Sequence, residues 1–441
     1  MADGLSEPHQ TAPDVAYCKN YSTILRKDSP FTLKMLEIQV TTNVQTPAGT
    51  GGQAVDLRDP YPFFAKKRRE ASVFCGTVMD YSKTPESLLP KREYSAMSFD
   101  AVNKVFRDGR VFSSKPYDKT IGLFMGPTIL AMDGKKHREH RNLVSAAFKS
   151  KALAHWEPTI VRPVCDALID EFIETGEADL VRNFTFEFPT RIIARLLGLP
   201  AEDLPTFRKR AVQLISYHVN YERAFEASAA LKEYFLEQIE QRKSKPTQDI
   251  IGDLVTAEID GEKLSDEAIY SFLRLLLPAG LETTYRSSGN LLYLLLTHPA
   301  QFAAVQAEHE LIPDAIEEGL RFETPLTTVQ RFTTEDTELD GVEIPARSVI
   351  GVCIGSANRD GLRWERPEDF DIFRKQMPHI SFAAGEHTCL GLHLARLETR
   401  VALQCLLNRL TNINLLTDDD PHIHGQPFRS PTALPVTFQA K

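Results

Sequence analysis

The amino-acid sequence predicts a mainly helical fold with a minor β region, and two patterns lead to that class. Apolar residues recur at spacings of three and four over several long segments, whereas strand character is limited to residues 329–355 and a short segment at 434–438. The 441-residue chain is also 42% hydrophobic and 25% charged, which is the composition of a globular protein with a large core. Collagen-like, disordered and coiled-coil classes are therefore excluded.

Helical periodicity first becomes clear in residues 158–174, where Ile160, Val164, Leu168 and Phe172 share one face. The same criterion predicts the remaining helices of the chain. They span residues 188–198, 203–218, 222–243, 265–297, 301–322 (as two short helices) and 390–410.

The longest predicted helix, residues 265–297, starts at Ser265, a residue type whose hydroxyl caps helix N-termini. At 1.5 Å per residue it would extend for about 50 Å. Pro278 and Gly280 interrupt its middle, and a proline inside a helix removes a hydrogen bond and costs about 3 kcal/mol. We therefore expect a local distortion there, which either serves function or only fits the helix to the core.

Strand character is concentrated in the last third of the chain. The dipeptide Asp340-Gly341 predicts a hairpin turn within residues 329–355, and residues 358–378 are rich in loop-forming residues. We expect the sheet to lie in the C-terminal half. Since no linker or internal repeat follows Pro60, residues 56–441 are predicted to form one domain after a loosely structured extension, residues 1–55.

The net charge of the chain and the length of its apolar segments exclude some classes of function. The chain has 51 Lys and Arg against 60 Asp and Glu, a net charge of −9, which argues against nucleic-acid binding. No apolar run approaches the roughly 18 residues that cross a bilayer, and the polar N-terminus does not resemble a signal peptide. We expect a cytoplasmic protein without a membrane anchor, with its six cysteines reduced because no export signal is evident. No CxxC pair occurs, which argues against a zinc ribbon or a thioredoxin-like motif.

Cys389 stands out among the cysteines because it follows a glycine-containing turn and precedes a predicted helix. The N–H groups and dipole of a helix start favour a thiolate. Gly385 allows a tight backbone turn, and Gly391 has no side chain to block a flat group. This pattern suits a thiolate that binds a metal in a planar macrocycle; a buried structural cysteine, or a zinc site with the neighbouring histidines His387 and His393, remain open.

The spacing Phe-x-x-Gly-x-x-x-Cys-x-Gly, formed by Phe382, Gly385, Cys389 and Gly391, resembles the haem-binding loop of the cytochrome P450 family. The resemblance implies haem b as cofactor and Cys389 as its iron ligand. It also implies the cytochrome P450 fold, in which haem lies between a long central oxygen-activating helix and the Cys-loop helix. It extends from about Asp59 to Thr437 and points to the bacterial type without a membrane anchor.

Further family signatures follow in the expected order. Ala279-Gly280-Leu-Glu282-Thr283 resembles the oxygen-activating segment, which implies that Glu282 and Thr283 deliver protons during catalysis; a Thr283 hydroxyl that only bonds a helix carbonyl is the alternative. Many relatives have Asp at the position of Glu282. The resemblance also implies a structural ion-pair network that braces the haem loop. Its members are Glu318, Arg321 and Arg374.

The two carboxylates of haem need cationic partners. His137 and Arg141 are four residues apart and so share a helix face, and the resemblance adds Arg331 and His387 as further contacts. Three nearby cations are either a solvated face or a basic patch for an acidic electron donor. They are Lys135, Lys136 and Arg138.

The resemblance implies a haem-thiolate monooxygenase that inserts one atom of O2 into a hydrophobic small molecule. No flavin or Rossmann segment is evident, so the electrons are expected from a separate ferredoxin and ferredoxin reductase. A peroxide-driven relative, an NADH-driven relative and a haem sensor or carrier without turnover are the alternatives. Terpenoid, steroid, fatty-acid and aromatic substrates stay open. The resemblance places apolar pocket residues at Phe124, Met125, Leu130, Leu214, Leu277, Leu326 and Val329.

Overall fold

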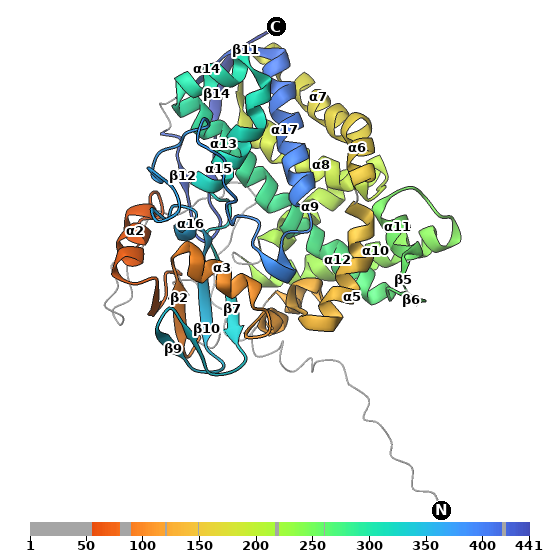
Figure 1. Ribbon diagram of the computed structural model, residues 1–441. Helices are drawn as coiled ribbons and strands as arrows, with labels where there is room; N and C mark the ends of the chain where they lie inside the picture. The colour runs from red at the N-terminus through yellow and green to blue at the C-terminus, as the bar shows by residue number, and fades with distance from the viewer. Residues whose placement is uncertain are drawn as a thin grey trace, which may run out of the picture. The chain divides into compact units, whose positions relative to one another are not determined.

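The computed structural model describes most of the chain beyond residue 54 (Figure 1). All described residues belong to one contact unit, Thr46–Lys441. The predicted N-terminal extension therefore lies outside the described residues except for Val55. The described ranges are 55–79, 90–119, 121–148, 150–216, 220–259, 261–416 and 420–441.

Helices dominate the described residues, as the apolar periodicity predicts, and several start at a capping side chain. The side chains of Ser98, Asn220, Asp249 and Ser265 each accept a hydrogen bond from a backbone N–H of the first turn. The α-helices are α2 (Tyr61–Glu70), α3 (Phe99–Arg107), α4 (Gly122–Met125), α5 (Gly134–Ser145), α6 (Ser150–Trp156), α7 (Arg162–Asp170), α8 (Glu187–Leu196), α9 (Leu204–Ile215), α10 (Tyr221–Ser244), α11 (Ile250–Thr256), α12 (Asp266–Leu276), α13 (Thr283–Thr297), α14 (Pro299–Ala307), α15 (Ile312–Phe322), α16 (Ile354–Ala357) and α17 (Leu392–Arg409).

The long predicted helix is present as α12 and α13, joined without a break by the π-helical segment Leu277–Glu282. Pro278 has no N–H to donate, and the wider π turn accommodates it where a regular α-helical bond could not form. The distortion expected at Pro278 and Gly280 is therefore a widened turn and not a break.

The main sheet has five strands in the order β1-β2-β10-β7-β3. β10 runs parallel to β2, with Val349 opposite Glu93, and antiparallel to β7. The expectation that the sheet lies in the C-terminal half is wrong, because three of these strands come from residues 73–113. The strands involved are β1 (Val73–Cys75), β2 (Glu93–Ala96), β3 (Phe112–Ser113), β7 (Thr328–Thr333) and β10 (Val349–Cys353).

The smaller sheets have two or three strands each. Asp340 and Gly341 form the predicted turn with φ of 49° and 78°, the left-handed pair that a tight hairpin requires. The strands are β4 (Glu177–Asp179), β5 (Glu258–Ile259), β6 (Glu262–Lys263), β8 (Thr337–Leu339), β9 (Val342–Ile344), β11 (Leu410–Leu415), β12 (Ile423–His424), β13 (Ser430–Pro431) and β14 (Pro435–Ala440), with β11, β14 and β4 in one sheet.

The largest apolar core joins the helices around α12, α13 and α17. α17, blue in Figure 1, packs against α15 and against α7, so the helix that follows Cys389 lies within the helical part of the protein. A second core lies between the five-stranded sheet and α3. None of the described helices is both long and apolar enough to cross a membrane.

Candidate functional site

The loop that carries Cys389 is held by backbone contacts on both sides. The Cys389 N–H donates to the Phe382 carbonyl oxygen at 2.8 Å, which closes the loop over the short helical turn Gly385–His387. Gly385 has φ of +72°, and a Cβ there would lie 2.5 Å from the Phe106 carbonyl oxygen of α3. Only glycine fits this close approach, which explains its place in the motif.

The surroundings of Cys389 do not by themselves favour its thiolate. The residue is half-buried and lies three residues before α17, and burial raises the pKa of its thiol. The Gly391 N–H and the cations Arg141 and Arg396 lower the pKa only in part. The Gly391 N–H beside the helix start thus favours the thiolate, as the sequence suggests, but burial has the larger effect on the pKa of Cys389.

His137 on α5 is a buried histidine whose hydrogen-bonding groups are unused. Neither ring nitrogen has a partner among the described residues, and its ring stacks on His387 with centroids 4.1 Å apart. Burial, with the neighbouring His387 and Arg141, lowers the pKa of His137 to about 4, so the ring is neutral near pH 7. Four residues on, Arg141 donates to the Thr388 carbonyl oxygen next to Cys389.

Asp133 lies beside His387, which belongs to the Cys389 loop. His387 Nε2 lies 3.8 Å from Asp133 Oδ1, and the Ser114 N–H donates to the same oxygen at 3.0 Å. Burial opposes ionisation of Asp133, but hydrogen bonds from His387, Ser113 and Ser114 lower its pKa to about 2. The structure thus brings His387 and His137 together, with Arg141 reaching the Cys389 loop.

These residues fit a flat, doubly anionic group such as haem. A Cβ at Gly391 would meet no atom within 4 Å, so a planar ring has room beside Cys389. The unpartnered nitrogens of His137 suit a carboxylate acceptor, because a buried polar group without a partner costs about 1–3 kcal/mol. Ala279 is exposed although Leu277 and Leu281 around it are buried, which opens the widened turn to a partner.

Zinc, the other metal considered from the sequence, has no support. Among the residues that the structure covers, no group of three or more His, Cys, Asp or Glu side chains is arranged to hold a metal ion.

The acid and alcohol of the central helix each have another partner. Thr283 Oγ1 donates to the Ala279 carbonyl oxygen at 2.7 Å, the bond to the helix backbone that the sequence left open. Glu282 is buried and accepts from Arg286 Nη2 at 2.9 Å. Burial raises the pKa of Glu282, and the Arg286 guanidinium opposes that rise.

Arg286 links Glu282 towards strand β13. Its Nη1 donates to Ser430 Oγ at 2.9 Å, and its guanidinium carbon lies 4.9 Å from the Tyr285 ring centroid. Glu282 and Arg286 are four residues apart on one helix face, so this ion pair could have been predicted from their spacing.

The structure brings the predicted ion-pair network together. Arg321 Nε and Nη2 donate to the two carboxylate oxygens of Glu318 at 2.7 and 2.8 Å, and Arg374 Nε lies 3.4 Å from Glu318 Oε1. All three side chains are almost fully buried. Arg321 also donates to backbone carbonyls of the 358–369 segment, which ties that loop to α15.

The remaining predicted residues are less closely grouped. Arg331 is buried on β7 and donates to the Gln330 carbonyl oxygen at 2.7 Å. Phe124, Met125, Leu214 and Leu277 belong to the largest core, whereas Val329 packs against the second core. Leu326 forms an isolated β-bridge with Phe428, and Leu130 is half-buried.

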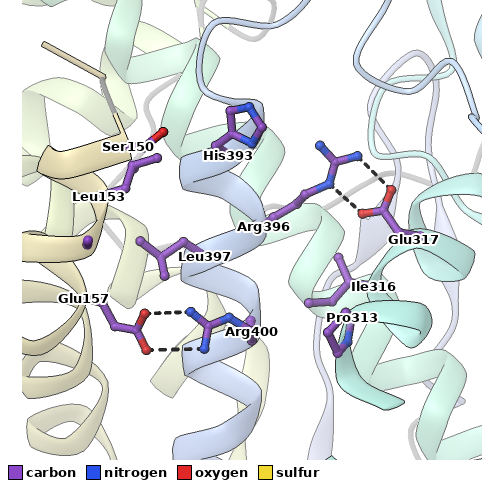
Figure 2. A pocket seen from close by; sticks show the side chains of 11 residues that line it. Ser150, Leu153, Glu157, Pro313, Ile316, Glu317, His393, Arg396, Leu397 and Arg400 are labelled. Atoms are coloured by element: carbon purple, nitrogen blue, oxygen red, sulfur yellow. Dashed lines mark hydrogen bonds and ion pairs between the residues drawn. The ribbon is translucent and has the colours of Figure 1, made fainter. Parts of the chain in front are cut away.

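A surface groove of about 410 Å³ lies along the helix that follows Cys389 (Figure 2). α17 forms its floor, and α6 and α15 form its sides. Two ion pairs cross it: Arg396 contacts both oxygens of Glu317 at 2.6 and 2.7 Å, and Arg400 Nη2 contacts Glu157 at 2.7 Å. Its lining residues are Ser150, Leu153, Ala154, Glu157, Pro313, Ile316, Glu317, His393, Arg396, Leu397 and Arg400.

Sequence reasoning missed the contact between this groove and the Cys389 loop. The Arg396 guanidinium carbon lies 4.7 Å from the ring centroid of Phe382, and His379 Nε2 lies 3.3 Å from Glu317 Oε2. The residues in this contact come from α15, α17 and the Cys389 loop, so no spacing in the sequence could have identified them.

Comparisons with known proteins agree on one family. The family model described as Cytochrome P450 matches residues 207–427, which include the Ala279–Thr283 and Phe382–Gly391 segments. Cytochrome P450 YjiB of Bacillus subtilis is 35% identical over 376 residues, 83% of this chain and 91% of that protein. The structure of CYP109Q5 from Chondromyces apiculatus has a TM-score of 0.79 at 32% identity, covering 87% of this chain and 96% of that one. CYP109E1 of Bacillus megaterium in complex with testosterone has a TM-score of 0.77 at 30% identity, covering 86% and 99%.

Proposed function

The chain belongs to the cytochrome P450 family of haem-iron monooxygenases, and from this premise we propose that it inserts one atom of O2 into a hydrophobic small molecule. The observation that carries the proposal is the loop around Cys389, with open space beside Gly391 and the unpartnered nitrogens of His137 at its edge. A sensor or carrier would need the loop but not the buried acid and the half-buried alcohol of the central helix.

Four residues would hold the cofactor. Cys389 would bind the iron, His137 and Arg141 would donate hydrogen bonds to the carboxylates, and Gly391 would leave room for the ring. When bound, haem supplies the redox chemistry that activates dioxygen, with the thiolate donating electron density. Arg141 would supply a positive charge at this pair, and the carboxylates would favour protonation of His137.

Glu282 and Thr283 would move protons into the site. Thr283 Oγ1 must release the Ala279 carbonyl oxygen before its proton is available to another acceptor. The Glu282 carboxylate must likewise leave Arg286 to reach the same side of the helix. The π-helical turn Leu277–Glu282 supports this role, because such turns occur frequently at functional sites.

Electrons are proposed to come from a separate ferredoxin and ferredoxin reductase. Lys135, Lys136 and Arg138 are exposed on α5, the helix whose Arg141 reaches the Cys389 loop. A basic surface beside the cofactor would speed the encounter with an acidic donor. Arg138 is paired with Glu386 at 3.0 Å and Lys135 with Glu139 at 3.6 Å, so Lys136 is the most available of the three charges.

The substrate is proposed to be mainly apolar. Phe124, Met125 and Leu277 belong to the same core beside the central helix, which supports an apolar pocket. The relative CYP109E1 was solved with testosterone, a largely apolar molecule, which agrees with this class. A cytoplasmic location stays a prediction.

Replacing the proposed iron ligand tests the function directly. We expect Cys389→Ala to lose the thiolate-type absorption spectrum of the reduced carbonyl complex. The control Cys353→Ala removes a different thiol, which is buried on β10, and should keep that spectrum. Retention of the spectrum in Cys389→Ala would refute the ligand assignment.

Turnover assays identify the electron source. The amount of product formed from candidate apolar substrates is measured under three conditions. The electrons come from ferredoxin and its reductase in the first and from NADH alone in the second, and hydrogen peroxide is supplied in the third. We expect product only with the ferredoxin system. Equal turnover with NADH alone or with peroxide would favour an NADH-driven or a peroxide-driven P450. No oxygen consumption with any donor would favour a sensor or carrier.

A further inference from the structure

Arg274 is a buried cation in α12, five residues before Ala279. Its side chain donates through Nη1 to Ser228 Oγ at 2.6 Å and through Nη2 to the Met125 carbonyl oxygen at 2.7 Å. Its guanidinium carbon lies 4.8 Å from the ring centroid of Tyr270. Arg274 is only 5% exposed, so α4, α10 and its own helix surround it.

No carboxylate forms an ion pair with Arg274 in the described part of the chain; Glu267 acts on its charge only as a longer-range Coulombic neighbour. Its acceptors are a hydroxyl and backbone carbonyls, none of which carries a charge. Burying an unpaired cation is costly, and proteins normally compensate it with a carboxylate. An arginine stays protonated even when burial lowers its pKa, so the charge is not removed by titration.

Two donors at the same place are also unused. Nε of Arg274 and Oγ of Ser271 are buried and lack a partner among the described residues. Ser271 lies three residues before Arg274 and therefore on the same helix face. An N–H and an O–H that share a face with an unpaired positive charge form a donor set for a carboxylate.

Arg274 lies beside the residues proposed to contact substrate. Met125, one of its acceptors, and Phe124 belong to the predicted pocket, and Gly126 follows them with a φ of +75°. A Cβ at Gly126 would lie 2.8 Å from Ser271 Oγ and 3.0 Å from Arg274 Nη2, so the chain passes close to both donors. The nine residues from Arg274 to Thr283 correspond to about 13 Å of helix.

We propose that Arg274 and Ser271 bind the carboxylate of the substrate, so that this enzyme oxidises apolar carboxylic acids. The acid group would lie at the α4 side of α12, and the apolar part would extend along the helix towards Ala279 and Thr283. This inference rests on the proposed function, because it requires a substrate beside the central helix.

The test uses three matched pairs of an acid and its methyl ester, added to the haem-loaded full-length protein. The acids are dodecanoate, lithocholate and 4-phenylbutyrate, which represent chain, steroid and aromatic skeletons. Binding is measured as the shift of the Soret band. A charge-assisted hydrogen bond predicts that at least one acid binds about ten- to a hundredfold more tightly than its ester. R274Q should abolish this preference while ester binding stays within about twofold.

A matched control keeps the result specific. Lys232 also lies over the Tyr270 ring, 5.0 Å from its centroid, but it is exposed, so K232Q should keep the preference for the acid. If R274Q does not fold, R274K serves instead: it retains the charge and should keep part of the preference. The inference is overturned if no acid binds more tightly than its ester, if R274Q keeps the preference, or if R274K loses it with ester binding intact.

Two further outcomes are informative. If R274Q weakens acid and ester equally, Arg274 only ties α4 and α10 to α12, and the inference fails. Imidazole, which binds haem iron directly, separates this failure from a failure of the proposed function. A Soret shift with imidazole but no preference for acids overturns the inference alone, whereas no shift with imidazole overturns both.

Discussion

Replacing Glu317 with Gln should remove a pH-dependent part of the stability. Glu317 on α15 accepts from Arg396 Nε and Nη2, and His379 Nε2 lies 3.3 Å away. Burial raises the pKa of Glu317, but Arg396 and His379 outweigh it and lower the pKa from 4.5 to about 2. The unfolded chain therefore takes up a proton before the folded one does as the pH falls.

The magnitude follows from that difference in pKa. Each unit corresponds to 1.36 kcal/mol, so a shift to about 2 corresponds to roughly 3 kcal/mol. The Glu317 and Arg396 side chains are 27% and 33% exposed, and screening by solvent reduces this to about 1–2 kcal/mol. This stability is fully present above pH 4.5 and is lost as the pH falls from 4.5 towards 2.

Urea denaturation followed by circular dichroism measures the effect. At pH 7 the free energy of unfolding of Glu317→Gln should be about 1–2 kcal/mol below that of the wild type, and at pH 3.5 the gap should be clearly smaller. Glu310→Gln, which changes an exposed acid, should stay within about 0.5 kcal/mol of the wild type. A gap that is the same at both pH values would refute the reasoning.

Three other substitutions test the site and its support. In Thr283→Ala, oxygen uptake should continue but yield hydrogen peroxide in place of product; an unchanged ratio of product to oxygen removes Thr283 from the proton path. Gly385→Ala should destabilise the fold by about 1–3 kcal/mol and reduce haem content, because its Cβ would meet the Phe106 carbonyl oxygen at φ of +72°. Wild-type haem content would contradict that close approach. Glu318→Gln leaves Arg321 buried without its anion and should cost about 3–5 kcal/mol in thermal or urea unfolding, whereas a loss below about 1 kcal/mol would contradict the burial argument.

Local signals in the sequence predict the helices well. Apolar periodicity identifies the long segments, and Ser265 caps α12 as its residue type predicts. Pro278 identifies the position of the distortion but not its π-helical form, because that form depends on how neighbouring helices pack. β1, β2 and β3 have two to four residues each and pair with distant strands, so periodicity could not detect them.

In the candidate site, too, some residues could be predicted from the sequence and others could not. Cys389, Gly385 and His137 stand in spaced motifs, which a single sequence can reveal. Arg274 has no such motif, since its significance depends on Met125 and Ser228, which reach it from other helices. The burial that raises the pKa of the Cys389 thiol was also beyond the sequence, because it depends on how the loop packs.

The parallel pairing of β2 with β10 has a consequence for how the protein is made. Val349 lies opposite Glu93, and more than half of the chain separates them, so the central strand of the sheet leaves the ribosome long after its partner. Until then, Glu93–Ala96 has one antiparallel neighbour and an unpaired edge, which is a site for misassociation. The haem loop is synthesised later still. This edge therefore stays open to pairing with other chains until residues 349–353 have been synthesised.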